Sequence, residues 1–276
     1  MATYVITGAA SGIGAASRSK LESAGHTVIG VDLGQTDIVA DLSTAGGRSA
    51  AAAAIDEASG GVVDGLVCCA GLGSLSRVTG GKLVAVNFFG TVDLVTALKP
   101  ALERARSASV VVISSSSTTT QPGIPEKLVT ACLDHDESEA VRIGDEVTPI
   151  PAYPASKLAL AWWIRREAVR TEWIGKGIRL NAIAPGMIDT PMTNGGDLDP
   201  ELAKSLDFYP IPLGRRGRPD EIAAVVEFLL GPGSTLFCGS VVFADGGTDA
   251  QLRQQDWPAE WTPTADELTR HFQAKT

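Results

Sequence analysis

The first 32 residues of the chain place the tightest limit on its fold, because they follow the order strand, glycine-rich turn, helix, strand. Residues 3–6 form a β-branched and aromatic run that is typical of a buried strand. Residues 15–24 indicate a helix, and residues 26–32 form a second apolar run that closes on an acid. The glycines of segment 7–14 let the backbone approach a pyrophosphate, and the helix N-terminus adds N–H donors. This unit predicts a nucleotide site.

Asp32 bears on which nucleotide is bound. It follows Gly14 by 18 positions (32 − 14), near the spacing of about 20 typical of the acid that accepts a hydrogen bond from the adenosine ribose. Its carboxylate would repel the 2′-phosphate of NADP, and no basic residue follows in segment 33–36. The sequence therefore predicts NAD. In the alternative interpretation, Asp32 only caps the turn after the strand.

Strands and helices alternate through the rest of the chain. The remaining predicted strands are residues 37–41, 62–70, 109–113, 179–183 and 239–247, and the remaining predicted helices are residues 45–59 and 82–106 and those beginning at Tyr153 and Pro219. This alternation predicts one doubly wound Rossmann-type α/β domain over residues 1–276, with a mostly parallel seven-stranded sheet flanked by helices. Within the long helix 82–106, Asn87 followed by Gly90 is a local weakness that can hold a water or a side chain.

Tyr153 and Lys157 are the candidate proton-transfer pair. Their spacing of four places both side chains on one face of a helix, and Pro154 suits its first turn. A nearby ammonium lowers the pKa of a phenol from about 10, so the pair can exchange a proton near neutral pH. In the alternative interpretation, the two residues share a surface helix by chance.

Polar and irregular segments follow the predicted strands at the edge where parallel sheets bind ligands. The serines of segment 114–117 follow the strand 109–113, and one of them is well placed to contact a substrate, although a flexible loop has the same composition. Residues 118–151 form an insertion with helical character at 124–142, and residues 193–212 form a mobile-looking substrate loop. These segments and the stretch before the loop offer apolar side chains that can line a substrate cavity. They are Ile124, Leu128, Val129, Leu133, Ile188, Met192, Leu198, Leu202, Leu206 and Phe208. Arg142 and Lys204 are isolated, so an apolar substrate is expected rather than a small acid or a sugar phosphate.

Composition excludes several classes of function. A net charge of -9 and a pI of about 4.9 disfavour nucleic acid and anionic membranes as partners. The four cysteines and three histidines fit no zinc site, so no metal is expected. The chain lacks a signal peptide pattern and any apolar run of about 20 residues, so a cytoplasmic protein with reduced thiols is expected. Cys68 and Cys69 are expected to pack as small hydrophobes, and the arginines of segment 215–218 to form a solvated or ion-paired corner.

Together these features resemble the short-chain dehydrogenase/reductase family along nearly the whole chain. The matching motifs are T-G-x-x-x-G-x-G at residues 7–14, Asp32, Asp41-Leu42, Ala70-Gly71, Asn87, Ser115, Y-x-x-x-K at Tyr153 and Lys157, and Pro185-Gly186 with Thr190. The resemblance implies that Tyr153 is the acid/base and that Lys157 lowers its pKa and holds the nicotinamide ribose. It also implies that Ser115 bonds the substrate oxygen and that Asn87 holds a water in a proton relay.

The resemblance also implies a set of cofactor contacts. They are Gly8, Ser11, Gly12, Ile13, Gly14, Asp32, Leu33, Asp41, Leu42, Ala70, Gly71, Tyr153, Lys157, Pro185, Gly186, Ile188 and Thr190. Two departures from the family pattern stand out. Segment 68–71 is Cys-Cys-Ala-Gly where the family has Asn-Asn-Ala-Gly, which could loosen cofactor contacts, and Ser115 and Tyr153 are 38 positions apart (153 − 115) where the family has a dozen or so. A similar insertion occurs in the subgroup of bacterial 3α-hydroxysteroid dehydrogenase/carbonyl reductases, which this chain resembles.

The predicted function is hydride transfer between NAD(H) and a cyclic, largely apolar secondary alcohol or ketone, with a hydroxysteroid as first choice and a monocyclic terpenoid alcohol as second. A catalytically silent NAD-binding regulator and a sugar epimerase or dehydratase of the longer related class are the alternatives. The complete set of Asn87, Ser115, Tyr153 and Lys157 argues against the regulator, and the glycine spacing and short C-terminal part argue against the epimerase. A small hydrophobic substrate and a homodimer or homotetramer are the expected partners.

Overall fold

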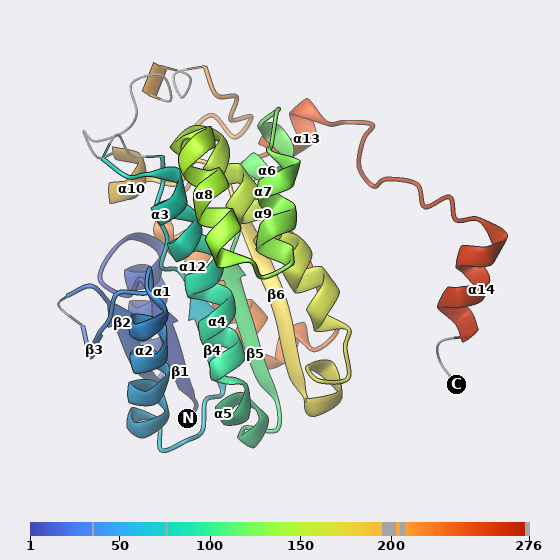
Figure 1. The fold of residues 1–276 in the computed structure, drawn as a ribbon. Helices are drawn as coiled ribbons and strands as arrows, with labels where there is room; N and C mark the ends of the chain where they lie inside the picture. The colour runs from blue at the N-terminus through green and yellow to red at the C-terminus, as the bar shows by residue number, and fades with distance from the viewer. Residues whose placement is uncertain (35, 75–76, 195–202, 205–207, 274–276) are drawn as a thin grey trace.

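The computed structural model describes the chain except residues 35, 75–76, 195–202, 205–207 and 274–276 (Figure 1). Seven strands form one sheet in the order β3-β2-β1-β4-β5-β6-β7, and every neighbouring pair is parallel. The strands are β1 Thr3–Thr7, β2 Thr27–Asp32, β3 Ile38–Val39, β4 Gly65–Cys68, β5 Ala108–Ile113, β6 Ile178–Pro185 and β7 Val241–Ala244. The prediction of a doubly wound, seven-stranded sheet is confirmed.

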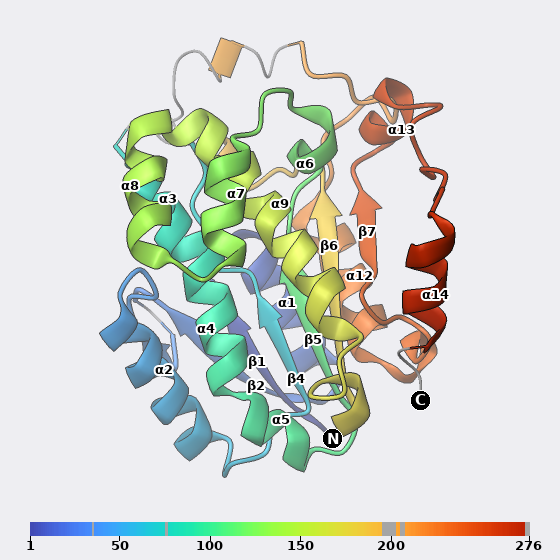
Figure 2. The ribbon, with the colours of Figure 1, turned by 45° about the vertical axis from the view of Figure 1, so that its right-hand side comes forward.

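Helices cover both faces of the sheet (Figure 2). The principal helices are α1 Gly12–Ser23, α2 Ala45–Ala58, α4 Gly90–Ala97, α5 Lys99–Arg104, α9 Pro149–Ala168 and α12 Pro219–Leu230. Val5 and Val112 point into the core shared with α2, α4 and α9. Ile6 and Val111 point to the opposite face, into the core shared with α1 and α12. Alternate residues of one strand are thus buried on both faces, which explains the unbroken apolar run of β5.

The predicted helix 82–106 is not continuous. It is divided into α3 Gly80–Val84, a π-helical turn (η1) Ala85–Phe89, α4 and α5. The expected weakness at Asn87 is confirmed, because this residue lies in the π-helical turn. Its side chain forms hydrogen bonds with Leu72 and Ser156, which lie outside this helical segment. The prediction of a single helix was therefore wrong, whereas the position of the defect was right.

Helix α9 begins at Pro149, four residues before the predicted start at Tyr153. Pro154 therefore lies inside the helix and not in its first turn, which corrects the sequence-based interpretation. A proline at this position cannot donate to the carbonyl of Ile150, four residues earlier. The side chain of Gln121 donates to that carbonyl instead, at 3.3 Å, so the polar group left by the proline keeps a partner.

The insertion 118–151 is mostly helical, as expected. It contains α7 Glu126–Leu133 and α8 Glu137–Val147 after the short helix α6 Ser117–Thr120. Helix α6 lies at the carboxyl edge of the sheet, whereas α7 and α8 lie alongside α9 and α3 (Figures 1 and 2). Helix α8 approaches α3 so closely that a Cβ on Gly80 would lie 1.9 Å from the carbonyl oxygen of Gly144. The insertion therefore extends the helical layer beside the sheet.

The C-terminal part of the chain contains further short helices, and the arginine corner at 215–218 is ion-paired as expected. The loop between β6 and α12 contains α10 Pro191–Asn194, and the chain ends with α13 Thr248–Leu252 and α14 Ala265–Gln273. Thr264 and Glu267 form a capping box at the start of α14, which lies away from the sheet (Figures 1 and 2). Arg215 pairs with Glu221 at 2.7 Å, and Arg218 pairs with Asp220 at 3.0 Å. Among the described residues, no helix is long and apolar enough to cross a membrane.

Candidate active site

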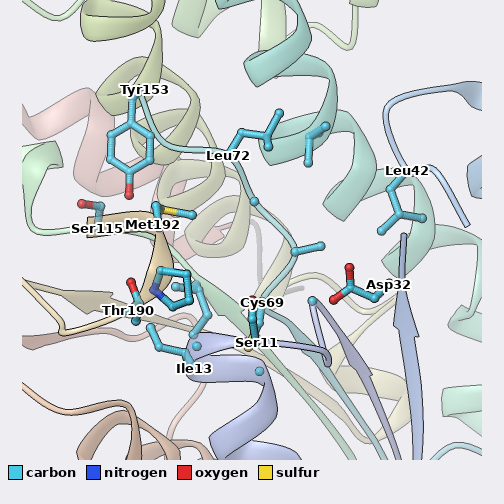
Figure 3. A pocket seen from close by; sticks show the side chains of 18 of the residues that line it. Ser11, Ile13, Asp32, Leu42, Cys69, Leu72, Ser115, Tyr153, Thr190 and Met192 are labelled. Carbon is cyan, nitrogen blue, oxygen red and sulfur yellow. The ribbon is translucent and has the colours of Figure 1, made fainter. Parts of the chain in front are cut away.

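A cavity of about 480 Å³ opens at the carboxyl ends of the strands (Figure 3). Its walls come from the turn after β1 and from the ends of β2, β4, β5 and β6, together with α9 and the segment that ends in α10. In Figure 3, Asp32 and Leu42 lie at one end of the cavity, and Tyr153, Ser115 and Met192 lie at the other. The strand order changes direction at β1 and β4, which is where parallel sheets of this type bind ligands.

The glycine-rich turn is built for close backbone contact. Gly8 has a φ of +69°, and a Cβ there would lie 2.7 Å from the backbone nitrogen of Ala70. A Cβ on Gly14 would lie 2.0 Å from the carbonyl oxygen of Gly8, so only glycine allows this packing of turn and helix. Ser11 makes no side-chain cap on α1, and the first turn of the helix contains no acid. The first N–H groups of α1 thus suit the anionic pyrophosphate of a dinucleotide.

The other end of the cavity suits an adenosine ribose. The carboxylate of Asp32 accepts hydrogen bonds from the backbone N–H groups of Leu33 at 2.7 Å and Ala10 at 2.9 Å. These bonds hold an anionic acceptor at the end of β2. Asp41 also lines this end, and hydrogen bonds from Ser43 keep the pKa of its carboxyl below the usual value. The residues present therefore fit NAD, whose ribose offers hydroxyl donors to a carboxylate.

Tyr153, Lys157 and Ser115 come together at the catalytic end. Burial raises the pKa of the Tyr153 phenol, and a hydrogen bond with Ser115 acts in the opposite direction. Burial lowers the pKa of Lys157 to about 8, and its Nζ donates to the carbonyl of Ile113 at 2.8 Å. Nζ lies 6.0 Å from the centre of the Tyr153 ring. The structure therefore corrects the prediction of a lowered phenol pKa, because burial outweighs the hydrogen bond with Ser115.

Asn87 lies behind the cavity and does not line it. Its Oδ1 accepts from the N–H of Leu72 at 2.7 Å, and its Nδ2 donates to the carbonyl of Leu72 at 3.0 Å and to Ser156 Oγ at 3.3 Å. A Cβ on Gly71 would lie 3.2 Å from Asn87 Oδ1 and 3.5 Å from Lys157 Nζ. Asn87 thus holds the loop after β4 next to Lys157, and its predicted role in a water relay stays a prediction.

The structure brings the remaining candidates together on one surface. The residues that line the cavity are Gly8, Ser11, Gly12, Ile13, Gly14, Asp32, Leu33, Asp41, Leu42, Ala70, Gly71, Ser115, Tyr153, Lys157, Pro185, Gly186, Ile188 and Thr190. Arg77 and Lys82 also line the cavity, and the sequence analysis missed them. The basic residues that it considered near the substrate were only Arg142 and Lys204, which it described as isolated. Arg77 and Lys82 both follow β4 at the ligand-binding edge, and this position was the available signal.

The apolar lining differs from the prediction. Leu128 and Val129 of the insertion are buried in the core against α9 and do not line the cavity. Ile188 and Met192 do line it, and Met192 lies against Gly73, where a Cβ would be 3.0 Å from its Cγ. Of the other candidates, Ile124 and Leu133 pack on the core, Phe208 is 87% exposed, and Leu198, Leu202 and Leu206 lie outside the described residues. Much of the predicted substrate loop 193–212 lies outside them as well.

The cysteines at the end of β4 behave as expected of packed thiols. Cys68 is buried, and burial raises its pKa well above the usual range. Cys69 lines the cavity, and burial raises its pKa to about 12. Both thiols are therefore protonated at neutral pH, which makes them poor nucleophiles.

Two family models match the chain. The model described as "short chain dehydrogenase" matches residues 2–125, and the one described as "Enoyl-(Acyl carrier protein) reductase" matches residues 139–249. The chain is 40% identical over 256 residues to the 3-alpha-hydroxysteroid dehydrogenase/carbonyl reductase of Comamonas testosteroni, covering 92% of this chain and 98% of the relative. It is 27% identical to the cis-4-hydroxycyclohexanecarboxylate dehydrogenase of Sinomonas cyclohexanicum, covering 89% and 96%.

Among solved structures, the chain is similar to the 3-alpha-hydroxysteroid dehydrogenase of Pseudomonas sp. B-0831, which was determined in complex with NADH. The TM-score is 0.88 and the identity 45%, and the match covers 92% of this chain and 100% of the other. The similarity therefore extends over most of the chain.

Proposed function

Because the chain belongs to the short-chain dehydrogenase/reductase family and is an oxidoreductase of it, we propose that its substrate is a cyclic, largely apolar secondary alcohol or the corresponding ketone. One observation carries the proposal. A single cavity has a glycine-rich turn and Asp32 at one end and Ser115, Tyr153 and Lys157 at the other. The first group suits a dinucleotide, and the second suits proton transfer at an alcohol oxygen.

The residues around the alcohol carbon have separate roles in the reaction. When bound, the nicotinamide ring supplies a hydride acceptor or donor. The buried phenol of Tyr153 is protonated at neutral pH, so it is ready to donate a proton to a carbonyl oxygen during reduction. Ser115 bonds the same oxygen, and the Lys157 ammonium donates to the nicotinamide ribose and favours the phenolate during oxidation. Asn87 supports Lys157 through the loop after β4.

NAD rather than NADP is the proposed cofactor. The carboxylate of Asp32 lines the cavity with both oxygens oriented by backbone donors, and a second carboxylate, Asp41, lies at the same end. A 2′-phosphate would add negative charge beside these groups and would be repelled. The relative from Pseudomonas sp. B-0831 was determined with NADH, which agrees with this preference.

A hydroxysteroid is the first-choice substrate, and a monocyclic terpenoid alcohol is the second. Leu72 and Met192 line the cavity near the catalytic end, and Ile188 also lines it. Burying apolar surface contributes about 25 cal/mol per Å². The names of two relatives, a 3-alpha-hydroxysteroid dehydrogenase/carbonyl reductase and a cis-4-hydroxycyclohexanecarboxylate dehydrogenase, both describe oxidation of a ring alcohol.

The substrate proposal is tested by comparing kcat/KM with NAD for a 3α-hydroxysteroid, a cyclic terpenoid alcohol and a polyol of similar size. We expect the hydroxysteroid to give the highest value and the polyol the lowest. The same panel with Tyr153→Phe measures the background rate. A polyol that exceeds both ring alcohols would exclude an apolar substrate, and equal rates for wild type and Tyr153→Phe would show that the measured turnover does not use Tyr153.

A further inference from the structure

Tyr209 joins the end of the substrate loop to the turn that carries Ser115. Its hydroxyl lies 3.0 Å from Ser116 Oγ and 3.3 Å from Thr120 Oγ1, and the ring is half-buried. Ser116 directly follows Ser115, and Thr120 is the last residue of α6. Sequence reasoning did not single out Tyr209, because it lies 93 positions from Ser116 and only the fold brings them together.

The hydroxyl protons of this cluster can be assigned by counting. Thr120 Oγ1 donates its one proton to the carbonyl of Ser116 at 3.0 Å. The bond between Thr120 and Tyr209 must then use the proton of Tyr209. The bond between Tyr209 and Ser116 must in turn use the proton of Ser116 Oγ. The three hydroxyls thus form a closed, one-directional chain that returns to the backbone of Ser116, and removing the hydroxyl of Tyr209 breaks two of its bonds.

Both partners of this contact are anchored elsewhere. After Tyr209, the carbonyl of Pro210 accepts from Thr248 Oγ1 at 2.7 Å, and Leu213 N–H donates to Gly246 at 3.0 Å, which fixes the chain on the turn after β7. On the other side, the N–H of Ser116 donates to the carbonyl of Pro185 at the end of β6, at 2.9 Å. The hydroxyl cluster therefore links the carboxyl ends of β5, β6 and β7.

We propose that Tyr209 is a positioning residue for the dehydrogenase reaction, a role that rests on the function proposed above. Its hydroxyl fixes the end of the substrate loop to the turn after β5, and this contact sets where Ser115 presents its own hydroxyl to the substrate oxygen. Burial is the main cause of the raised pKa of the Tyr153 phenol, and Tyr209 adds to it, in agreement with a cluster close to the reacting groups. Within the part of the chain that the structure describes, the cluster hydroxyls form no hydrogen bond with Asp32 or the glycine-rich turn at the cofactor end.

The test uses single substitutions in the full-length protein. Tyr209→Phe keeps the ring and removes two hydrogen bonds, so we expect kcat/KM for the alcohol to fall about 10-fold while the Kd for NADH changes less than about 2-fold. Thr119 and Thr120 provide a matched pair, because both hydroxyls donate to the carbonyl of Ser116 but only Thr120 contacts Tyr209. Thr120→Val should lower kcat/KM, and Thr119→Val should not.

A double-mutant cycle separates positioning from a general loss of stability. The effects of Tyr209→Phe and Ser116→Ala on kcat/KM should be non-additive, since either change breaks the same chain of bonds. Three outcomes would each overturn the proposal. The losses in kcat/KM of the two single variants could multiply in the double variant, Tyr209→Phe could keep the wild-type kcat/KM, or Thr119→Val and Thr120→Val could lose equally. A wild-type protein that oxidises no secondary alcohol with NAD would instead overturn the proposed function.

Discussion

At the scale of single residues, one physical cause shifts the pKa values of Tyr153 and Lys157 in opposite directions. Burial disfavours the charged form of each group, so it raises the pKa of the phenol and lowers that of the ammonium. The phenol is therefore neutral at physiological pH, and the ammonium loses its proton as the pH rises through about 8. The neutral phenol suits the acid role in reduction, whereas oxidation needs the phenolate that an ammonium favours.

Tyr153→Phe is the direct test of the acid/base assignment. We expect the variant to fold and to bind NADH, since the ring and its packing are kept, but to lose about 10²–10⁴-fold in kcat because no proton can be transferred. Stopped-assay kcat values and NADH fluorescence titrations measure the two properties separately. A variant with near wild-type kcat would remove Tyr153 from the mechanism.

The lowered pKa of Lys157 predicts a pH dependence of stability. Its folded pKa of about 8 lies below the ordinary value of 10.5, so the unfolded chain binds more protons between these values. The free energy of unfolding should therefore rise with pH across this window, by about 2 kcal/mol between pH of about 7.5 and about 9.5. Urea unfolding without cofactor measures the rise as the difference between wild type and Lys157→Met, which cancels the titration of other groups. A difference that does not change with pH would mean that the lysine titrates normally.

The position of Asp32 predicts that replacing this residue changes the preference between NAD and NADP. Leu33 is 69% exposed and lines the same end of the cavity, so an arginine there can reach a 2′-phosphate. We expect Asp32→Ala with Leu33→Arg to raise the ratio of kcat/KM with NADP to that with NAD by at least about 10-fold. Leu33→Arg alone is the control, and it should shift the ratio less because the repelling carboxylate remains. An unchanged ratio in the double variant would separate Asp32 from the ribose.

At the scale of secondary-structure elements, local patterns predicted the order and type of the strands and long helices, but not every boundary. The π-helical turn at Asn87 was foreseeable as a weak point because an asparagine competes for backbone bonds. The early start of α9 was not, because it depends on Gln121 supplying a donor to Ile150 from a distant segment. The contact of Gly80 with Gly144 was also not predictable, because the sequence does not distinguish a glycine that faces solvent from one that faces another helix.

The glycine contact between α3 and α8 gives an element-scale prediction. A Cβ on Gly80 would lie 1.9 Å from the carbonyl oxygen of Gly144, so Gly80→Ala must push the helices apart. We expect the free energy of unfolding to fall by about 1–3 kcal/mol. Gly46→Ala in α2 is the matched control, because nothing lies within 4 Å of its Cβ position. It should be neutral or up to about 1 kcal/mol stabilising. Equal effects of the two changes would show that α3 and α8 are not in close contact.

At the scale of the whole molecule, the alternation of strands and helices was enough to predict one parallel sheet and the edge where residues distant in sequence meet. The candidate residues from the glycine turn to Thr190 line one cavity because the carboxyl ends of parallel strands share an edge. The insertion was harder to place, since its apolar residues suit either a lining or a core. Leu128 and Val129 pack into the core beside α9, where nearly all of their apolar surface is removed from water.

In the C-terminal arm, defined as residues 257–276, the residues that the structure describes are mostly exposed. Trp257 is 57% exposed and Trp261 is 63% exposed, and α14 lies away from the sheet. Little apolar surface is buried by the arm, and little stability should depend on it.

Truncation after Asp256 is therefore expected to leave kcat/KM unchanged and to change the free energy of unfolding by less than about 1 kcal/mol. Full-length protein with Trp257→Ser and Trp261→Ser is the matched comparison, because it removes the exposed aromatic rings but keeps the length of the arm. Urea unfolding and steady-state kinetics measure both variants, and sedimentation equilibrium at several concentrations reports whether either changes the oligomeric state. A loss of more than about 1 kcal/mol that depends on protein concentration would show that the arm packs on a second copy. A loss independent of concentration would show that it packs on its own domain, which contradicts the exposure of its two tryptophans.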